Sequence, residues 1–416
     1  MITLAPGSAQ AERILARRDP ALPGLPWLLD NARLSELLGE TVRVTRVRYK
    51  PGTSLLVAYR RLRNGSFDYG WALTRAPGSS KLLERERTSR TRGRDMRILR
   101  PDPAHPETLV AVGGVEDDWA LQKNLTWLRE KGAERLGLHT KPGAALFSGS
   151  AVLRYKPERR LVLLVQKEGT AVVIKAAARP ADRGQQTPFL NRLEHHGVPL
   201  LPQLGDAQCL KHGISACVAW GGGNLAGFDD DSSASAAGEA LARLHGIPAP
   251  GWHAPGIKAQ LQATRNMVSS LLPALEEPAR RIEAGLGPLL LDGAGSGQVL
   301  VHGDFSPDQV LVGGPEVRLI DFERSHAGAA EADLGSFAAA EEAVLQASGG
   351  SPAGGPKTAS LLEGYRHAGG RFSRSRVDAW AAFRLFSGST DPFRDRAPDW
   401  AGDMSWHLNR VMELIP

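Results

Sequence analysis

Three side chains with oxygen donors lie in residues 299–323, which read VLVHGDFSPDQVLVGGPEVRLIDFE. Asp304 and Gln309 lie in a polar loop between two apolar, strand-like runs, and Asp321 follows a third run. The Gly-Gly-Pro sequence between the second and third runs predicts a hairpin turn, so the three side chains should gather around one point. Carboxylate and amide oxygens are hard donors that suit Mg²⁺. The three runs are Val299–Val301, Val310–Val312 and Val317–Ile320.

The rest of the chain changes from strand-like to helical patterning. Short runs separated by turn residues predict strands, among them an antiparallel meander over residues 151–175. From Ser232 the apolar residues take a helical spacing, and serines are placed to cap the first helix. Strands first and helices later is the α+β pattern. The predicted strands are Val42–Arg48, Leu55–Arg60, Tyr69–Thr74, Ala151–Tyr155, Leu161–Gln166 and Ala171–Lys175, and the predicted helices lie near 232–246, 256–286, 333–347, 357–368, 376–387 and 400–414.

An internal similarity links the two groups of strands. RVRYKPGTSLLVAY at 46–59 resembles VLRYKPERRLVLLV at 152–165, and both copies are followed by a third strand. The third strand reaches Lys175 in the second copy and Thr74 and Arg75 at the comparable place in the first. A duplicated three-stranded module that keeps its lysine only in the second copy explains this pattern. A single repeat is too few for a solenoid protein. The alternative to a duplication is a chance likeness between two amphipathic hairpins.

Composition and charge limit the class of protein. The 416 residues are 42% hydrophobic and 23% charged, which excludes a wholly disordered chain, a collagen and a coiled coil. There is no apolar run of about 18 residues and no signal-peptide core, and two cysteines cannot make a disulfide scaffold, so we expect a soluble cytoplasmic protein with reduced thiols and no membrane partner.

Charge is divided between two parts of the chain. Residues 1–221 carry a net charge of +14 and residues 222–416 one of −8. This division favours a polyanion on one side and a polar or cationic molecule on the other, although two solvated faces would give the same totals. The basic stretch Lys81–Arg100 lacks interleaved aromatic residues, so we expect an exposed, partly mobile loop and no nucleic-acid partner.

The 299–323 segment resembles the catalytic core of the aminoglycoside phosphotransferase/choline kinase family, which has a protein-kinase-like fold. The family's His-Gly-Asp and Ile-Asp motifs match His302-Gly303-Asp304 and Ile320-Asp321. An upstream helix, GEALARLHG, and the later Ala332-Asp333-Leu334-Gly335 resemble two further family motifs. Together the matches cover about residues 141–416. They imply a two-lobed fold with an antiparallel-sheet N-lobe and a mainly helical C-lobe, in which the motif histidine and Asp333 hold the loop rather than touch substrate.

The resemblance implies an ATP- and Mg²⁺-dependent phosphotransferase. Asp304 would accept or orient the proton of an acceptor hydroxyl, Asp321 would bind Mg²⁺, and Lys175 would hold the α- and β-phosphates. In this fold the strand lysine pairs with a helix glutamate. The matching position is Gln186 and the nearest carboxylate is Glu194, so the partner of Lys175 stays open.

Gln309 stands where the family usually has asparagine as a metal ligand. It either marks a crippled metal site, and so a pseudokinase, or a branch that uses glutamine, since a longer side chain keeps the carbonyl oxygen. Asp321-Phe322-Glu323 together with this glutamine resembles the maltokinase/glucosamine kinase branch, in which Glu323 is a further candidate metal ligand. That branch carries a cap ahead of the N-lobe, and the segments around Gln309 match it only in part.

Two segments are candidates for holding the nucleotide. The turn that begins at Lys156 and ends at Arg160 lies where the fold has its phosphate-covering loop, and its basic side chains would screen phosphate charge or remain solvated. The segment Cys217–Gly223 resembles the hinge whose backbone groups read adenine, which places Ala219 beside the base.

These features predict three parts of the chain. Residues 1–140 form an N-terminal cap, a possible degenerate repeat of the N-lobe sheet; 141–222 form the kinase N-lobe and hinge; 223–416 form the helical C-lobe with the catalytic loop and acceptor site. The favoured acceptor is a hydroxyl of a sugar or amino sugar, and an aminoglycoside-type antibiotic is the alternative. A non-catalytic, nucleotide-binding pseudokinase is the alternative of another class. The sequence leaves the oligomeric state open. Candidate acceptor residues in the late helices are Glu341, Glu342, Glu363, Asp378, Asp391, Asp395, Asp399, Trp380, Phe383, Trp400 and Trp406.

Overall fold

The structure, a computed structural model, forms two compact units. Unit 1 comprises Met1–Arg183, Pro202–Ala219 and Pro392–Ala401, and unit 2 comprises Gly184–Leu201, Trp220–Asp391 and Gly402–Pro416. The expected boundary between cap and N-lobe, at 140/141, lies outside the described residues. The structure describes residues 4–63, 65–78, 80–138, 150–167, 169–179, 186–249, 256–291, 297–350 and 355–415.

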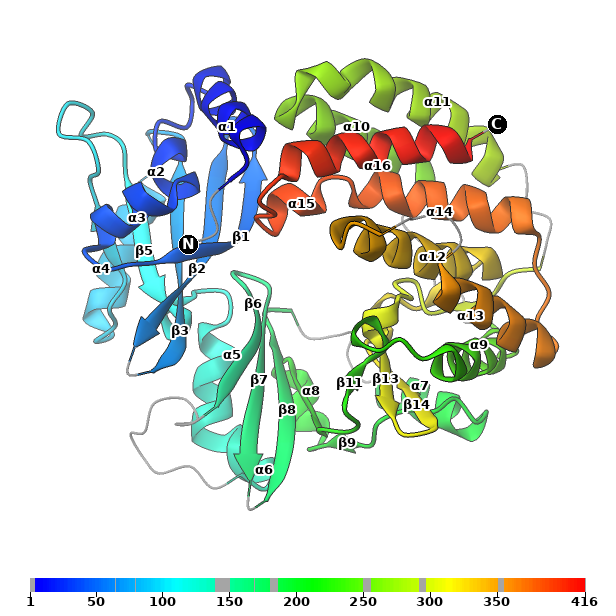
Figure 1. Cartoon of the computed structure of the whole chain (residues 1–416). Helices are drawn as coiled ribbons and strands as arrows, with labels where there is room; N and C mark the ends of the chain where they lie inside the picture. The colour runs from blue at the N-terminus through cyan, green and yellow to red at the C-terminus, as the bar shows by residue number, and fades with distance from the viewer. Residues whose placement is uncertain are drawn as a thin grey trace. The chain divides into compact units, whose positions relative to one another are not determined.

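Unit 1 contains two five-stranded antiparallel sheets (Figure 1). The cap sheet has the strand order β1-β2-β3-β5-β4, and the N-lobe sheet has the order β6-β7-β8-β10-β9. The strands are β1 (Arg43–Lys50), β2 (Ser54–Arg63), β3 (Ser66–Arg75), β4 (Arg97–Leu99), β5 (Val110–Gly114), β6 (Ala151–Lys156), β7 (Arg160–Lys167), β8 (Thr170–Ala177), β9 (Gln203–Leu204) and β10 (Ile214–Val218). Its helices are α1 (Pro6–Arg18), α2 (Leu25–Leu29), α3 (Asn31–Leu38), α4 (Lys81–Thr91), α5 (Gln122–Trp127), α6 (Ala133–Arg135) and α8 (Ala207–Lys211).

The two sheets share more than their strand order. In each, a three-residue turn joins the first two strands and has one residue with positive φ, Gly52 at 64° in the cap and Glu158 at 58° in the N-lobe. In the cap, Asp19 Oδ2 accepts from the Tyr49 hydroxyl at 2.7 Å and from the Gly52 N–H at 2.9 Å.

The N-lobe repeats this arrangement with different residues. Asp118 Oδ2 accepts from the Tyr155 hydroxyl at 3.0 Å and from the Glu158 N–H at 2.7 Å. The matched order, turn and hydrogen bonds support a duplicated module. Strand register also corrects one expectation: Leu73, which is buried, occupies the cap position equivalent to Lys175, in place of Thr74 or Arg75.

One hydrophobic core joins the cap sheet to the N-lobe sheet. Leu56 and Trp71 from the cap belong to the same buried cluster as Leu161 and Ile174 from the N-lobe. Leu125, from α5, belongs to this cluster as well. Burial of about 25 cal/mol per Å² of apolar surface stabilises this arrangement, so the cap and the N-lobe sheet form one body.

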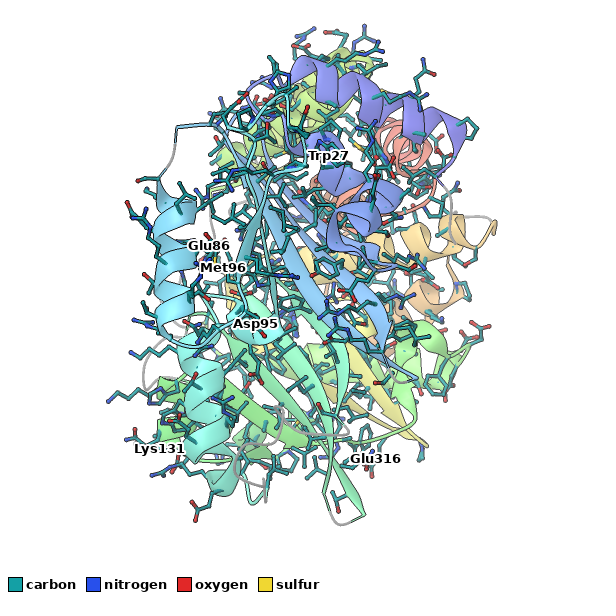
Figure 2. The ribbon with its side chains drawn as sticks, turned by 90° about the vertical axis from the view of Figure 1, so that its left-hand side faces the viewer. Trp27, Glu86, Asp95, Met96, Lys131 and Glu316 are labelled. Atoms are coloured by element: carbon teal, nitrogen blue, oxygen red, sulfur yellow. The ribbon has the colours of Figure 1, made fainter. Side chains whose placement is uncertain are left out.

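The prediction of an exposed loop over Lys81–Arg100 is wrong. The stretch forms α4 and β4, and two of its apolar side chains, Leu82 and Met96, are buried in the unit 1 core. Glu86 on α4 accepts a hydrogen bond from the backbone N–H of Ile98 at 2.9 Å and lies near Met96 in Figure 2. Basic side chains on the remaining faces hid this amphipathic pattern in the sequence.

Unit 2 is mainly helical. Its helices are α7 (Gln186–His195), α9 (Asp231–His245), α10 (Ile257–Leu271), α11 (Glu276–Leu291), α12 (Ala330–Ala347), α13 (Pro356–His367), α14 (Arg374–Gly388) and α16 (Trp400–Leu414), of which α16 begins in unit 1; the short α15 (Asp391–Arg394) lies at the boundary. Its strands are β11 (Gly223–Asn224), β12 (Val299–Val301), β13 (Val310–Gly313), β14 (Glu316–Leu319) and β15 (His326–Gly328). Asp230 caps α9 by accepting from the N–H groups of Ser232 and Ser233. A sheet-rich unit and a mainly helical unit confirm the predicted α+β class. Among the described residues, no helix is long and apolar enough to cross a membrane.

A segment from the late helical region belongs to unit 1. Pro392–Ala401 packs on the cap, where Arg396 pairs with Glu12 and donates to the Leu29 carbonyl at 2.8 Å. Both charged side chains are buried. Burial raises the pKa of Glu12 although Arg396 opposes the shift. The cap is therefore held together by a segment from near the C-terminus as well as by its own N-terminal residues.

We expect Arg396→Met to destabilise the protein by about 3 kcal/mol, because it leaves the Glu12 carboxylate buried without its partner. Urea unfolding followed by tryptophan fluorescence measures the change. Arg280→Met, which removes an exposed pair with Glu277, is the control and should leave stability unchanged. Equal effects from the two substitutions would contradict the role given to the buried pair.

Candidate active site

A buried carboxylate organises the His302-Gly303-Asp304 loop of unit 2. Asp333 on α12 accepts from the backbone N–H of His302 at 2.6 Å and of Gly303 at 2.9 Å. His245 on α9 contacts the same carboxylate through Nε2 at 3.0 Å and holds the Tyr365 hydroxyl with Nδ1 at 2.8 Å. Burial alone would raise the pKa of Asp333, but the hydrogen bond and charge of His245 hold it below its usual value. The loop is thereby tied to α9 and α12 by an ionised side chain.

Two residues of the loop, Gly303 and His302, restrict its conformation. Gly303 has φ of 81°, and a Cβ there would come within 2.2 Å of the Arg324 carbonyl oxygen. His302 is fully buried between two phenylalanine rings, and its Nε2 lies 2.9 Å from the Ile320 carbonyl oxygen. The histidine therefore connects the Asp304 loop to the strand that precedes Asp321.

Asp304 is partly exposed and faces two cations. Its Oδ1 lies 3.4 Å from Arg324 Nη1 and 3.5 Å from Arg384 Nη2. Arg384 comes from α14, and Arg324 comes from the turn after Asp321. Both separations are longer than close hydrogen bonds, so the guanidinium groups surround the carboxylate without clamping it. Neither arginine stood out in the sequence, because no motif marks them.

The hairpin expected around Gln309 and Asp321 forms. β13 and β14 pair in antiparallel fashion, and the backbone N–H of Ile320 donates to the backbone carbonyl oxygen of Gln309 at 3.1 Å. Asp321 adopts the left-handed conformation, with φ of 68°. This backbone costs on the order of 1 kcal/mol outside glycine, and such strain clusters at functional positions.

The donor atoms at this hairpin fit Mg²⁺. The Gln309 amide nitrogen donates to Asp308 at 3.1 Å, so the amide oxygen is the side-chain atom that could bind a metal. Glu323 is exposed. Among the described residues no three His, Cys, Asp or Glu side chains gather as a metal site, but one or two carboxylates completed by nucleotide phosphates suffice for Mg²⁺.

The residues expected to hold the nucleotide all belong to unit 1, whereas Asp304, Gln309, Asp321 and Glu323 belong to unit 2. Lys156 and Arg160 pair across the β6–β7 turn, and Lys175 lies on β8 opposite Val162. Burial, and then Arg154 and Arg160 nearby, lower the pKa of Lys156 to about 7.

The structure describes the hinge candidate Ala219 and, of the two possible helix partners of Lys175, the side chain of Glu194 alone. The Ala219 N–H donates to the Ala171 carbonyl at 2.8 Å, so the Ala219 carbonyl is the group it can offer to adenine. Unit 1 ends at this residue. Glu194 is exposed, and the side chain of Gln186 lies outside the described residues.

Several candidate acceptor residues have structural roles instead. Glu341 accepts from the N–H groups of Lys357 and Thr358 and so caps α13, while Glu342 pairs with Arg410. Asp395, Asp399 and Trp400 lie in the unit 1 segment that packs on the cap. These contacts give Glu341 and Glu342 structural roles, and the acceptor site in the late helices stays a prediction.

One residue with a clear position was missed. Glu158, in the β6–β7 turn, has positive φ and accepts from Trp119 Nε1 at 2.6 Å. It also pairs with Arg48 of the cap. The only signal in the sequence was the difference between Lys-Pro-Glu here and Lys-Pro-Gly in the first copy.

Comparison with known proteins decides the family. The sequence model described as the phosphotransferase enzyme family matches residues 147–386, more than half of the chain. The chain belongs to this family. It is therefore a small-molecule kinase, and its His302-Gly303-Asp304 loop lies within the matched region. No curated protein matches the sequence.

Solved structures of similar arrangement have low sequence identity. A choline/ethanolamine kinase family protein from Mesorhizobium loti is 17% identical, with 71% of this chain and 94% of that chain covered and a TM-score of 0.49. Choline kinase LicA from Streptococcus pneumoniae is 14% identical, with coverages of 64% and 92% and a TM-score of 0.48. Macrolide 2'-phosphotransferase MphH from Brachybacterium faecium is 16% identical, with coverages of 70% and 98% and a TM-score of 0.40.

We expect Gly303→Ala to lose more than about 2 kcal/mol of unfolding free energy, because it combines positive φ with a clash against a carbonyl oxygen. Gly314→Ala is the matched control, since Gly314 has φ of 65° and open space around a Cβ. It should lose only about 1 kcal/mol. Chemical denaturation compares the two, and a Gly303→Ala protein as stable as the control would refute the assigned loop path.

Proposed function

We propose that the chain transfers the γ-phosphoryl group of ATP to a hydroxyl of a small molecule, with a sugar as the favoured acceptor. The observation that carries the proposal is the Asp304 loop, held by the buried Asp333 and lying within the matched family region. Phosphoryl transfer depends mostly on positioning and charge neutralisation, which such a fixed loop provides.

Each side chain has a proposed part. Asp304 accepts or orients the proton of the attacking hydroxyl. Asp321 and the Gln309 oxygen hold Mg²⁺, with Glu323 as a further ligand, and the metal neutralises phosphate charge. Lys175, Lys156 and Arg160 hold the phosphates, and the Ala219 carbonyl receives a hydrogen bond from adenine.

The charges around Asp304 favour one acceptor class over another. Arg324 and Arg384 both approach its Oδ1, so the acceptor side of the carboxylate carries two positive charges for one negative charge. A polycationic aminoglycoside would be repelled at this point. A neutral sugar, whose hydroxyls accept hydrogen bonds from guanidinium groups, fits better than an amino sugar.

Removing the carboxylate of Asp304 tests the proposal. We expect Asp304→Asn to lower the rate of ADP release with Mg-ATP by about 100-fold or more, because the amide cannot accept the hydroxyl proton. The assay uses a panel of sugars, amino sugars, aminoglycosides and choline. Calorimetry should show that the variant still binds Mg-ATP. A variant as active as wild type would overturn the role of Asp304, and nucleotide binding without turnover in wild type would favour the pseudokinase.

The depressed pKa of Lys156 gives a second test. Because its pKa is about 7, the ammonium loses its proton as pH rises from 6 to 8, and phosphate binding should weaken over that range. Lys156→Arg, whose charge does not titrate there, should show a flatter profile. The dissociation constant of Mg-ATP measured across this pH range decides, and parallel profiles would exclude Lys156 from the phosphate site.

A further inference from the structure

We propose that Glu158 is a positioning residue through which the cap fixes the nucleotide-phosphate turn between β6 and β7. The inference rests on the proposed function, since it takes this turn to be the one that covers the phosphates. Every residue that carries it belongs to unit 1.

The backbone at Glu158 is the first observation. The equivalent turn of the cap has Gly52 at the left-handed position, and glycine adopts positive φ without strain because it has no Cβ. The N-lobe turn has glutamate at the same position with φ of 58°. Both turns use the same aspartate and tyrosine contacts, so those contacts do not require a glutamate. A residue with a side chain at a strained backbone position, where glycine would also fit, indicates a role for that side chain.

The contacts of the carboxylate are the second observation. Oε1 accepts from Trp119 Nε1 at 2.6 Å, and Oε2 pairs with Arg48 on β1 of the cap. Trp119 in turn packs edge-on against Trp71 of the cap sheet, with ring centroids 4.8 Å apart. The tip of the N-lobe turn is thus joined to two separate strands of the cap.

The surrounding charge makes the carboxylate difficult to replace. Arg85 on α4 lies over the Trp119 ring at 3.8 Å. The pKa of Arg85 is lowered, mainly by its burial and then by the nearby charge of Arg75. Among the described residues, Arg75 Nε and Arg85 Nη1 are buried without a hydrogen-bond partner. Glu158 pairs with Arg48, and its charge opposes the lowering of the pKa of Arg85. Without it, Arg85 would keep the repulsion from Arg75 and lose the anion that opposes it.

These observations give the cap a task in the reaction. A turn free to move would lose entropy when it closes on the phosphates, and a turn held in place beforehand does not. Glu158 links the turn to a sheet with its own hydrophobic contacts, so the cap lowers the dissociation constant of the nucleotide without touching it. Lys156 and Arg160, at the two ends of the turn, are the side chains positioned in this way.

Calorimetric titration of the full chain with Mg-ATP tests the inference. We expect Glu158→Gly and Arg48→Met each to raise the dissociation constant about fivefold or more. Arg48→Lys keeps a cation for the carboxylate and should restore binding to within about twofold of wild type. Glu158→Gly relieves the positive-φ strain but removes two contacts, so its melting temperature is measured beside that of Tyr49→Phe, and every titration is run well below both. Tyr49→Phe, which removes the matching contact in the cap turn, is the control and should bind Mg-ATP as wild type does.

The outcomes separate the two proposals. Weaker binding in Glu158→Gly and Arg48→Met but not in Tyr49→Phe supports the positioning role, because a loss of stability alone does not weaken binding while the variant stays folded. Equal binding in all variants overturns the inference and leaves the proposed function standing. Absence of Mg-ATP binding in wild type overturns the proposed function, and the inference with it.

Discussion

The Asp304 loop depends on one buried anion, the carboxylate of Asp333. Asp333 holds the N–H groups of two consecutive loop residues, and His245 supplies the charge that keeps the carboxylate ionised away from water. An unpaired carboxylate at this depth would be strongly destabilising, so α9, α12 and the loop must form together. Asp304, which is partly exposed, follows directly after the two residues that Asp333 holds, so this network fixes its position in the chain.

In unit 1, the cap sheet and the N-lobe sheet are similar in strand order and in their turn contacts. Two copies of one sheet module share a strand order and an aspartate–tyrosine turn lock, but the cap copy has Leu73 in the core at the position of Lys175. Leu73 packs into the core that the two sheets share. Arg48 of the cap pairs with Glu158 in the turn of the N-lobe sheet.

Much of this could be predicted from the sequence. The strands, the later helices and the β13–β14 hairpin followed from periodicity and from glycine and proline at turns. Prediction failed where contacts distant in sequence decide: α4 has many basic residues and only a few apolar ones, and Pro392–Ala401 pairs with α1 across almost the whole chain. Arg384 and Glu158 had no motif, because their roles arise from packing between elements rather than from local pattern.

The central claim is that the phosphoryl group passes from nucleotide to a small-molecule hydroxyl. Mass spectrometry of an acceptor mixture, incubated with ATP that carries ¹⁸O on its γ-phosphoryl group, tests it most directly. The account predicts an acceptor, a sugar first, that gains one phosphoryl group with the labelled oxygens while ADP forms. Label found only in inorganic phosphate, with every acceptor unchanged, would contradict it.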